Sequence, residues 1–195
     1  MDELYPGYDV LDKWRSPSFD DITRTVVADR LDNIPERRFL TASEWTLLEA
    51  LAERLVPHKP RSPVAIVPWI DDALANGKIA SFRRSGDPQD QQIWRDGLAA
   101  IDREARRRHG GDFAMLDAEA GEMLLQDIKG GAVSDGWSGV APKRFLIDIL
   151  LREMVAVYYS HLQGWNAIGF GGPASPRGYV RTQLGGRDPW EAKEK

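Results

Sequence analysis

A helix signal between residues 41 and 57 constrains the fold of this chain more than any other feature of the sequence. Thr41 and Glu44 have the T-x-x-E spacing of a capping box, in which both side chains bond the free amide groups at the start of a helix. Behind them, apolar residues recur every three or four positions as far as Pro57, which cannot continue a helix. The segment therefore predicts an amphipathic helix that ends before Pro57.

The same helical period marks further segments of the chain. Ser18 and Asp21 have the spacing of a second capping box, which predicts a helix over residues 18–31. The apolar face expected for this helix consists of Phe19, Ile22 and Val26. Three more helices are predicted, one from Pro68 to about Gly77, one capped by Asp87 and Pro88 that ends at His109, and one from Asp117 to Gly130.

The last helix is predicted from about Pro142 to Tyr159 and is apolar almost all round, which is typical of a central helix covered by others. No segment keeps the alternation of apolar and polar residues that predicts a strand. We therefore predict an all-α fold, a small helical bundle of about five to six helices with extended N- and C-terminal arms. Its expected core consists of Trp45, Leu48, Leu51, Leu55, Trp94, Leu98, Phe145, Ile149 and Leu150.

The two ends differ in composition from the middle of the chain. We expect an N-terminal arm with one short helix over residues 1–38, a helical core domain over 39–162, and a C-terminal arm without secondary structure over 163–195. Both arms are aromatic, unlike a disordered linker, and Trp and Tyr are enriched among the residues that dominate protein interfaces. The arms are therefore predicted to bind a partner protein through Tyr5, Tyr8, Trp14, Trp165, Phe170, Tyr179 and Trp190. The alternative is that they only cover the chain's own helices.

Composition argues against several classes of protein. The chain has no Cys, which removes disulfides, thiolate catalysis and iron–sulfur ligation. A net charge of −4 argues against nucleic-acid binding by neutralisation of phosphates. No stretch is apolar for long enough to insert directly into a membrane, and the N-terminus lacks the basic and apolar regions of a signal peptide.

Three motifs that suggest chemistry have simpler structural explanations. Residues 169–174 match the G-x-G-x-x-A pattern of dinucleotide-binding folds, but no strand is predicted before them and no helix after them. A turn whose backbone passes close to another surface explains these glycines better. His58, His109 and His161 lie at or near predicted helix ends, where capping is the default explanation rather than metal binding. The basic run Arg103, Arg106, Arg107 and Arg108 fits a solvated helix end, with an anionic partner as the alternative.

Five segments, taken in order, resemble the pattern of the gluconate 2-dehydrogenase subunit 3 family. The first is F-L-T-A-S-E-W at 39–45 with L-A-E-R-L-V-P at 51–57. V-P-W-I-D follows at 67–71, and W-R-D-G-L-A-A-I-D at 94–102. The last two are F-L at 145–146 leading to Y-Y-S at 158–160, and G-W at 164–165 with I-G-F-G-G-P at 168–173.

The resemblance implies a non-catalytic small subunit without catalytic, cofactor-binding or metal-binding residues of its own. The partner it implies is a large FAD-dependent dehydrogenase of the glucose–methanol–choline type, which holds the FAD and oxidises sugars, sugar acids or glycosides. A cytochrome c subunit is a further expected partner. The resemblance implies a periplasmic complex, and the missing signal peptide makes the cytoplasm the alternative location.

Two other classes compete with this interpretation. An unrelated helical adaptor or regulatory module would have the same composition. A free-standing enzyme is disfavoured, because the sequence offers no nucleophile, metal-ligand set or phosphate loop.

Overall fold

The structure of the chain is a computed structural model, which describes residues 4–17, 19–56, 64–79, 85–173 and 191–193. Within these ranges it contains seven α-helices, two short 3-10 turns and one π-helix, and no strand, so the predicted all-α class is confirmed. The chain divides into two compact units. Unit 1 comprises Met1–Ile34, Lys59–Val64 and Tyr158–Lys195, and unit 2 comprises Pro35–His58 and Ala65–Val157.

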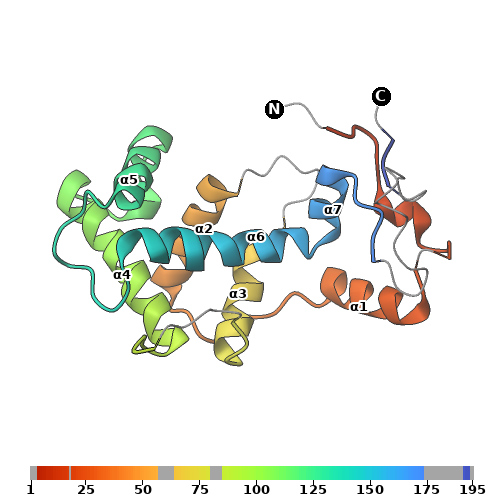
Figure 1. Cartoon of the computed structure of the whole chain (residues 1–195), viewed down its shortest axis with the longest axis horizontal. Coiled ribbons are helices and arrows are strands. Elements are labelled where there is room, and N and C mark those ends of the chain that lie inside the picture. Colours follow the sequence, from red (N-terminus) through yellow and green to blue (C-terminus); the bar gives the residue numbers. More distant parts are fainter. Residues whose placement is uncertain (1–3, 18, 57–63, 80–84, 174–190, 194–195) are drawn as a thin grey trace. The chain divides into compact units, whose positions relative to one another are not determined.

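Unit 2 is arranged around one helix, α2 (Ala42–Leu55). This helix contacts α3 (Ile66–Ala75), α4 (Asp90–His109), η2 (Phe113–Met115) and α5 (Ala118–Gly130). The π-helix η3 (Arg144–Leu151) contacts α5 and continues into α6 (Arg152–Tyr159), and Figure 1 shows the two as one continuous helix.

The core of unit 2 agrees with the prediction at seven positions. Leu48, Leu51, Trp94, Leu98, Phe145, Ile149 and Leu150 are buried. Trp45 and Leu55 are only half-buried, so their assignment to the core is wrong. Trp45 lies at the edge of the apolar face of α2, where its Nε1 donates to Glu49 Oε1 at 2.8 Å.

The helix ends test the capping predictions one by one. The Thr41 and Glu44 capping box of α2 is present, and Asp117 caps α5 by accepting from Ala120 N at 2.8 Å. The prediction for α4 is wrong, because the helix begins at Asp90 after Gln89, and Asp87 is instead bonded to Arg144 Nη1 and Nη2 at 2.9 and 2.5 Å. An ion pair to a distant residue has drawn the capping carboxylate away from the helix.

The last long helix is not covered on all sides, which corrects the prediction of a central helix without a polar face. Phe145, Leu146, Leu150 and Met154 are buried, but Val155 is 37% exposed on the other side of the same helix. Apolar residues occupy positions all around this helix, which is why the sequence predicts a central helix. In the structure only one side of the helix is buried against other elements.

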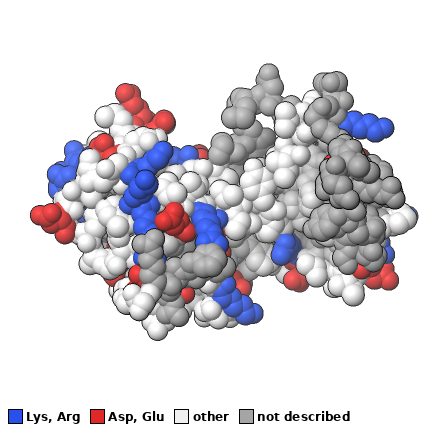
Figure 2. Space-filling model, in the orientation of Figure 1, with Lys and Arg blue, Asp and Glu red and all other residues white. Residues whose placement is uncertain are grey.

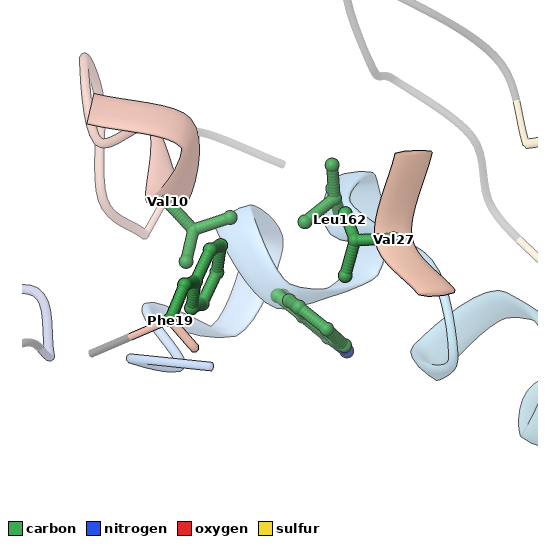
Figure 3. Packing of buried hydrophobic residues seen from close by; sticks show 5 residues of the cluster. Val10, Phe19, Val27 and Leu162 are labelled. Carbon is green, nitrogen blue, oxygen red and sulfur yellow. The ribbon is translucent and has the colours of Figure 1, made fainter. Parts of the chain in front are cut away.

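Unit 1 contains η1 (Val10–Lys13), α1 (Asp21–Asp32) and α7 (Leu162–Ile168). Its core is a cluster of five buried residues, Val10, Phe19, Val27, Leu162 and Trp165, of which Figure 3 labels the first four. Helix α7 corrects the prediction that residues 163–195 lack secondary structure. It was missed because Gly164 lies inside a helix of seven residues.

Helix α1 differs from its prediction at its start and on its apolar face. Its N-cap is Asp20, which accepts from Thr23 N at 2.7 Å, so the predicted start of the helix at residue 18 is wrong. Ser18, the other half of the predicted capping box, lies outside the described residues. The predicted apolar face is also wrong apart from Phe19, because Ile22 is 75% and Val26 49% exposed. Val27 is the residue of α1 that enters the core.

Candidate functional site

The aromatic residues predicted in the two arms come together in unit 1. Tyr8, Trp14 and Phe170 are half-buried and pack against the cluster of Figure 3. Trp165 belongs to that cluster, with its ring 5.7 Å from Phe170 in an edge-to-face arrangement and its Nε1 donating to Tyr159 O at 2.7 Å. Tyr5 is also half-buried. Tyr179 and Trp190 lie outside the described residues.

Hydrogen bonds fasten the N-terminal arm to the segment around α7. Tyr8 Oη donates to Phe170 O at 2.9 Å, and Val10 N donates to Asn166 Oδ1 at 2.8 Å. The Asn166 amide in turn donates to Asp9 Oδ1 at 3.2 Å. Residues more than 150 positions apart are therefore joined within one unit.

The glycines of the G-x-G-x-x-A segment make the close approach predicted for them. Gly169 and Gly172 have φ of +66° and +87°, a backbone conformation that residues other than Gly rarely adopt. A Cβ on Gly169 would meet Tyr5 and Ala192, and a Cβ on Gly172 would meet the ring of Phe19. The turn thus lets the backbone lie directly against the N-terminal arm.

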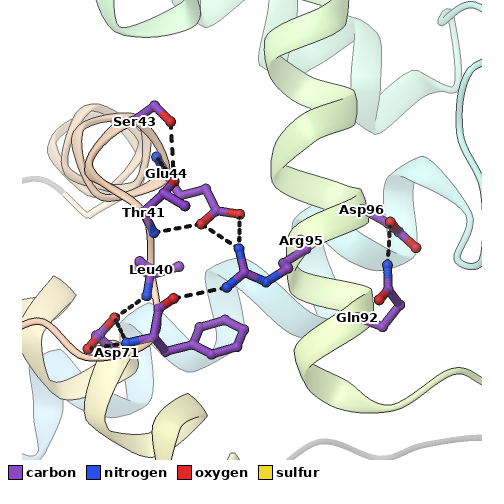
Figure 4. Close-up of polar contacts among 9 residues, drawn as sticks. Leu40, Thr41, Ser43, Glu44, Asp71, Gln92, Arg95 and Asp96 are labelled. Carbon is purple, nitrogen blue, oxygen red and sulfur yellow. Dashed lines mark hydrogen bonds and ion pairs between the residues drawn. The ribbon is translucent and has the colours of Figure 1, made fainter.

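In unit 2, the side chain of Asp71 is the centre of a polar junction (Figure 4). Asp71 is fully buried on α3, and its carboxylate accepts from the backbone N of Arg38 at 2.5 Å and of Leu40 at 2.6 Å. Phe39 N lies 3.1 and 3.2 Å from the two oxygens. A buried carboxylate is stable only when it is hydrogen-bonded, and three consecutive amides supply those bonds here.

Two further side chains complete this Asp71 junction, which we define as Asp71, Glu44, Arg95 and the backbone of residues 38–41. Arg95 on α4 donates to both carboxylate oxygens of Glu44 at 2.8 Å and to Phe39 O at 2.9 Å. Its guanidinium also lies over the Phe39 ring, 4.4 Å from the centroid. Glu44 accepts from Thr41 N at 2.8 Å as part of the capping box. The start of α2 is therefore joined to both α3 and α4.

Gly97, one turn after Trp94 on α4, provides the close contact between this helix and η3. Phe145 lies edge-to-face against Trp94, with centroids 6.1 Å apart. A Cβ on Gly97 would overlap the Phe145 ring. The glycine is therefore required by packing within unit 2.

Three arginines of the basic run at the end of α4 are paired with carboxylates, and the fourth, Arg103, donates to the backbone carbonyl of Gly136. Glu104 is 1% exposed and accepts from Arg107 Nη2 at 2.9 Å and from Arg108 Nε at 3.2 Å. Arg106 pairs with Asp102 and Asp112, both at 2.6 Å. On the face that Figure 2 shows, basic and acidic side chains of unit 2 lie interspersed, which supports the helix-end explanation over an anionic partner.

Glu104 also holds the loop that follows α5. Its Oε1 accepts from Ser134 N at 2.8 Å and from the Ser134 hydroxyl. Burial alone would raise the pKa of the Glu104 carboxyl, but the hydrogen bonds from Ser134 and Arg107 outweigh burial and lower this pKa to about 2. The carboxylate is therefore charged throughout the physiological pH range.

Among the described residues, no group of three or more His, Asp or Glu is arranged to hold a metal ion. His109 is the last residue of α4, His161 lies between α6 and α7, and His58 is outside the described residues. No described helix combines the length and the apolar character needed to cross a membrane.

In this all-α protein, side chains from three helices, Glu44, Asp71 and Arg95, hydrogen-bond the backbone of residues 38–41. The sequence matches the gluconate 2-dehydrogenase subunit 3 family over residues 42–172 of 195, and the chain belongs to that family. The resemblance found from the five segments is thereby confirmed. Comparisons with curated proteins and with solved structures gave no match.

Sequence reasoning found half of the Asp71 junction. The capping box identified Thr41 and Glu44, because a cap is a local pattern. Asp71 and Arg95 lie in segments that resemble the family, but no local pattern predicts their contacts, because their partners lie 31 to 56 positions away. The one signal for Asp71 was a carboxylate directly after an apolar helical run, where a buried charge needs a partner.

Proposed function

We propose that this chain is a non-catalytic small subunit that binds the large catalytic subunit of a dehydrogenase complex in an accessory, chaperone-like or stabilising role. That partner is an FAD-dependent flavoprotein of the glucose–methanol–choline type, which holds the FAD and oxidises sugars, sugar acids or glycosides. A cytochrome c subunit that receives the electrons is a further proposed member. The observation that carries the proposal is the family match over residues 42–172.

The contacts of the motif residues support an accessory role. Asp71, Glu44 and Arg95 are bonded to one another or to backbone of unit 2, and Glu104 is bonded to Ser134 and two arginines. Carboxylates and guanidiniums in such contacts stabilise a fold, whereas a catalytic acid or base must reach a substrate.

We assign partner binding to unit 1, where the aromatic residues of the two arms gather. Tyr5, Tyr8, Trp14 and Phe170 are half-buried, so part of each residue remains exposed. Trp165 is 8% exposed, and its ring lies edge-to-face against that of Phe170. Tyr179 and Trp190, outside the described residues, belong to the same proposed contact.

The experiment is a native pull-down of the untagged complex, with mass spectrometry and an absorption spectrum of the eluate. We expect one flavoprotein in stoichiometric amount, with its flavin, and no flavin absorbance from the purified small chain after desalting. A small chain that elutes alone, or that retains flavin by itself, contradicts the proposal.

A further inference from the structure

Helix α3 ends at an Asn-Gly pair, the dipeptide in which an asparagine side chain reacts most readily with the backbone that follows it. Of the three asparagines in the sequence, Asn33 and Asn166 precede residues with a side chain, and Asn76 precedes a glycine. Asn76 and Gly77 are both exposed, and a Cβ on Gly77 would meet nothing within 4 Å. The site is therefore open to water, and the missing side chain leaves the backbone N of Gly77 unhindered.

Hydrogen bonds engage both groups that would react. The Asn76 amide accepts at Oδ1 from Arg38 Nη2 at 2.9 Å and donates from Nδ2 to Asp72 O at 2.9 Å. Gly77 N donates to Leu74 O at 3.2 Å. In the folded chain, the amide of Asn76 and the backbone N that would attack it are thus held by separate partners.

The end of α3 fixes the backbone at the same place. Asn76 is the C-cap residue, Gly77 follows with a φ of +62°, and Lys78 N donates to Ala73 O at 2.8 Å. Together with the bond from Gly77 N to Leu74 O, this is a Schellman motif, which closes the last turn of a helix. The reaction requires this turn to open, because Gly77 N must leave Leu74 O before it can reach Cγ of Asn76.

We propose that Asn76 is a site of spontaneous covalent modification, at which Gly77 N attacks the side-chain amide when the end of α3 opens, and that Arg38 restrains the reaction. The bond between Gly77 N and Asn76 Cγ forms, the bond between Cγ and Nδ2 breaks, and ammonia leaves with the proton from Gly77 N. Water then opens the resulting succinimide ring at either of its carbonyls. One opening gives aspartate, and the other gives isoaspartate, whose backbone is longer by a methylene group.

Both products change contacts that reach the Asp71 junction. Arg38 bonds Asn76 through its side chain and Asp71 through its backbone N at 2.5 Å. Aspartate at position 76 would give the Arg38 guanidinium a second carboxylate beside that of Asp72, which lies 3.6 Å from it. Isoaspartate would instead lengthen the backbone at the C-cap and disturb the Schellman bonds. The reaction therefore alters both the charge and the geometry at the end of α3.

Incubation of the full chain at mildly alkaline pH, with and without urea, tests the site. Peptide mapping by mass spectrometry, with fragmentation that distinguishes isoaspartate from aspartate, follows the products. We expect both products at position 76, formed at least about tenfold more slowly without urea because the last turn of α3 must open first. Asn33 and Asn166 are internal controls and should stay intact while Asn76 is half-converted in urea. The proposal is overturned by no product in urea, by aspartate without isoaspartate, or by equal rates in the two conditions.

The substitution Arg38→Ala tests the restraint. It removes the bond to Asn76 Oδ1 but keeps the backbone bond to Asp71, and the Arg38 side chain is 51% exposed, so the variant should fold. Because one hydrogen bond changes an opening equilibrium by about three- to tenfold, we expect the rate at position 76 to rise by that factor. Arg37→Ala removes the exposed neighbouring arginine and should leave the rate unchanged. Equal rates in the two variants would show that Arg38 does not restrain the site.

Discussion

A single carboxylate, that of Asp71, holds the chain segment before α2. Asp71→Asn keeps the shape of the side chain but replaces one acceptor oxygen by an NH₂ group that faces backbone amides. Because hydrogen bonds to a charged group contribute about 1.5–3 kcal/mol, we expect the free energy of unfolding to fall by about 2–4 kcal/mol. Urea denaturation measures it.

The neighbouring Asp72 is the matched control for that substitution. Its side chain is 30% exposed and lies 3.6 Å from Arg38. Exposed ion pairs contribute about 0–1 kcal/mol, so Asp72→Asn should lower stability by less than about 1 kcal/mol. Similar losses from the two variants would mean that the three amide bonds to Asp71 are not what stabilises this segment.

Glu104 makes the stability of the chain depend on pH in acid. Its folded-state pKa of about 2 lies below the ordinary value of 4.5, so the unfolded chain takes up the proton first as the pH falls. The ionised Glu104 carboxylate therefore adds about 3 kcal/mol to the free energy of unfolding above pH 4.5. This contribution is lost as the pH falls from 4.5 to about 2. Glu104→Gln should therefore be less stable than wild type by roughly this amount at pH 7.

Urea titrations at pH 7, 5 and 3 follow the Glu104 contribution. The difference between wild type and Glu104→Gln should stay constant from pH 7 to 5 and shrink at pH 3. Glu122→Gln on the exposed side of α5 provides the control and should show no such convergence. A constant difference down to pH 3 would place the pKa of Glu104 near its ordinary value.

At the scale of the helix, substitutions at Gly97 and Gly130 distinguish the effect of packing on stability from that of helix propensity. Ala is about 1 kcal/mol better than Gly inside a helix, but a Cβ on Gly97 would overlap the Phe145 ring. We expect Gly97→Ala to lower the melting temperature, with a net loss of about 1–3 kcal/mol. Gly130→Ala at the end of α5, where a Cβ meets nothing within 4 Å, should leave it unchanged or raise it. A stabilised Gly97→Ala would mean that η3 shifts easily away from α4.

The helices were predictable where their signals are local. The cap at Thr41, the start of α5 at Asp117 and its end at Gly130 each depend on residues within one turn, and each was predicted. Asp87 failed as a cap because Arg144, 57 positions away, binds it. Helix α7 was missed because Gly164 normally argues against a helix, whereas here a side chain would collide with the Tyr158 carbonyl.

At the scale of the whole chain, the meeting of the two ends could not be derived from the sequence. Tyr8 and Phe170 are 162 positions apart, and no periodicity links them. The aromatic content of both arms indicated that they bind something, and the structure shows them bonded to each other in unit 1. The same packing turned Ile22 and Val26 of α1 outward, against the prediction from helical periodicity.

The two units have separate cores, which predicts that they can be destabilised separately. Trp165→Ala removes a buried indole and its bond to Tyr159 O, a change that costs about 3–5 kcal/mol in a packed core. Hydrogen exchange should become faster in peptides from α1 and α7, while peptides from α2 and α4 keep their protection. Trp94→Ala, in the core of unit 2, is the matched control and should give the opposite pattern. If either variant accelerated hydrogen exchange equally in both units, the chain would unfold as one cooperative domain. The binding of a partner to unit 1 would then stabilise unit 2 as well.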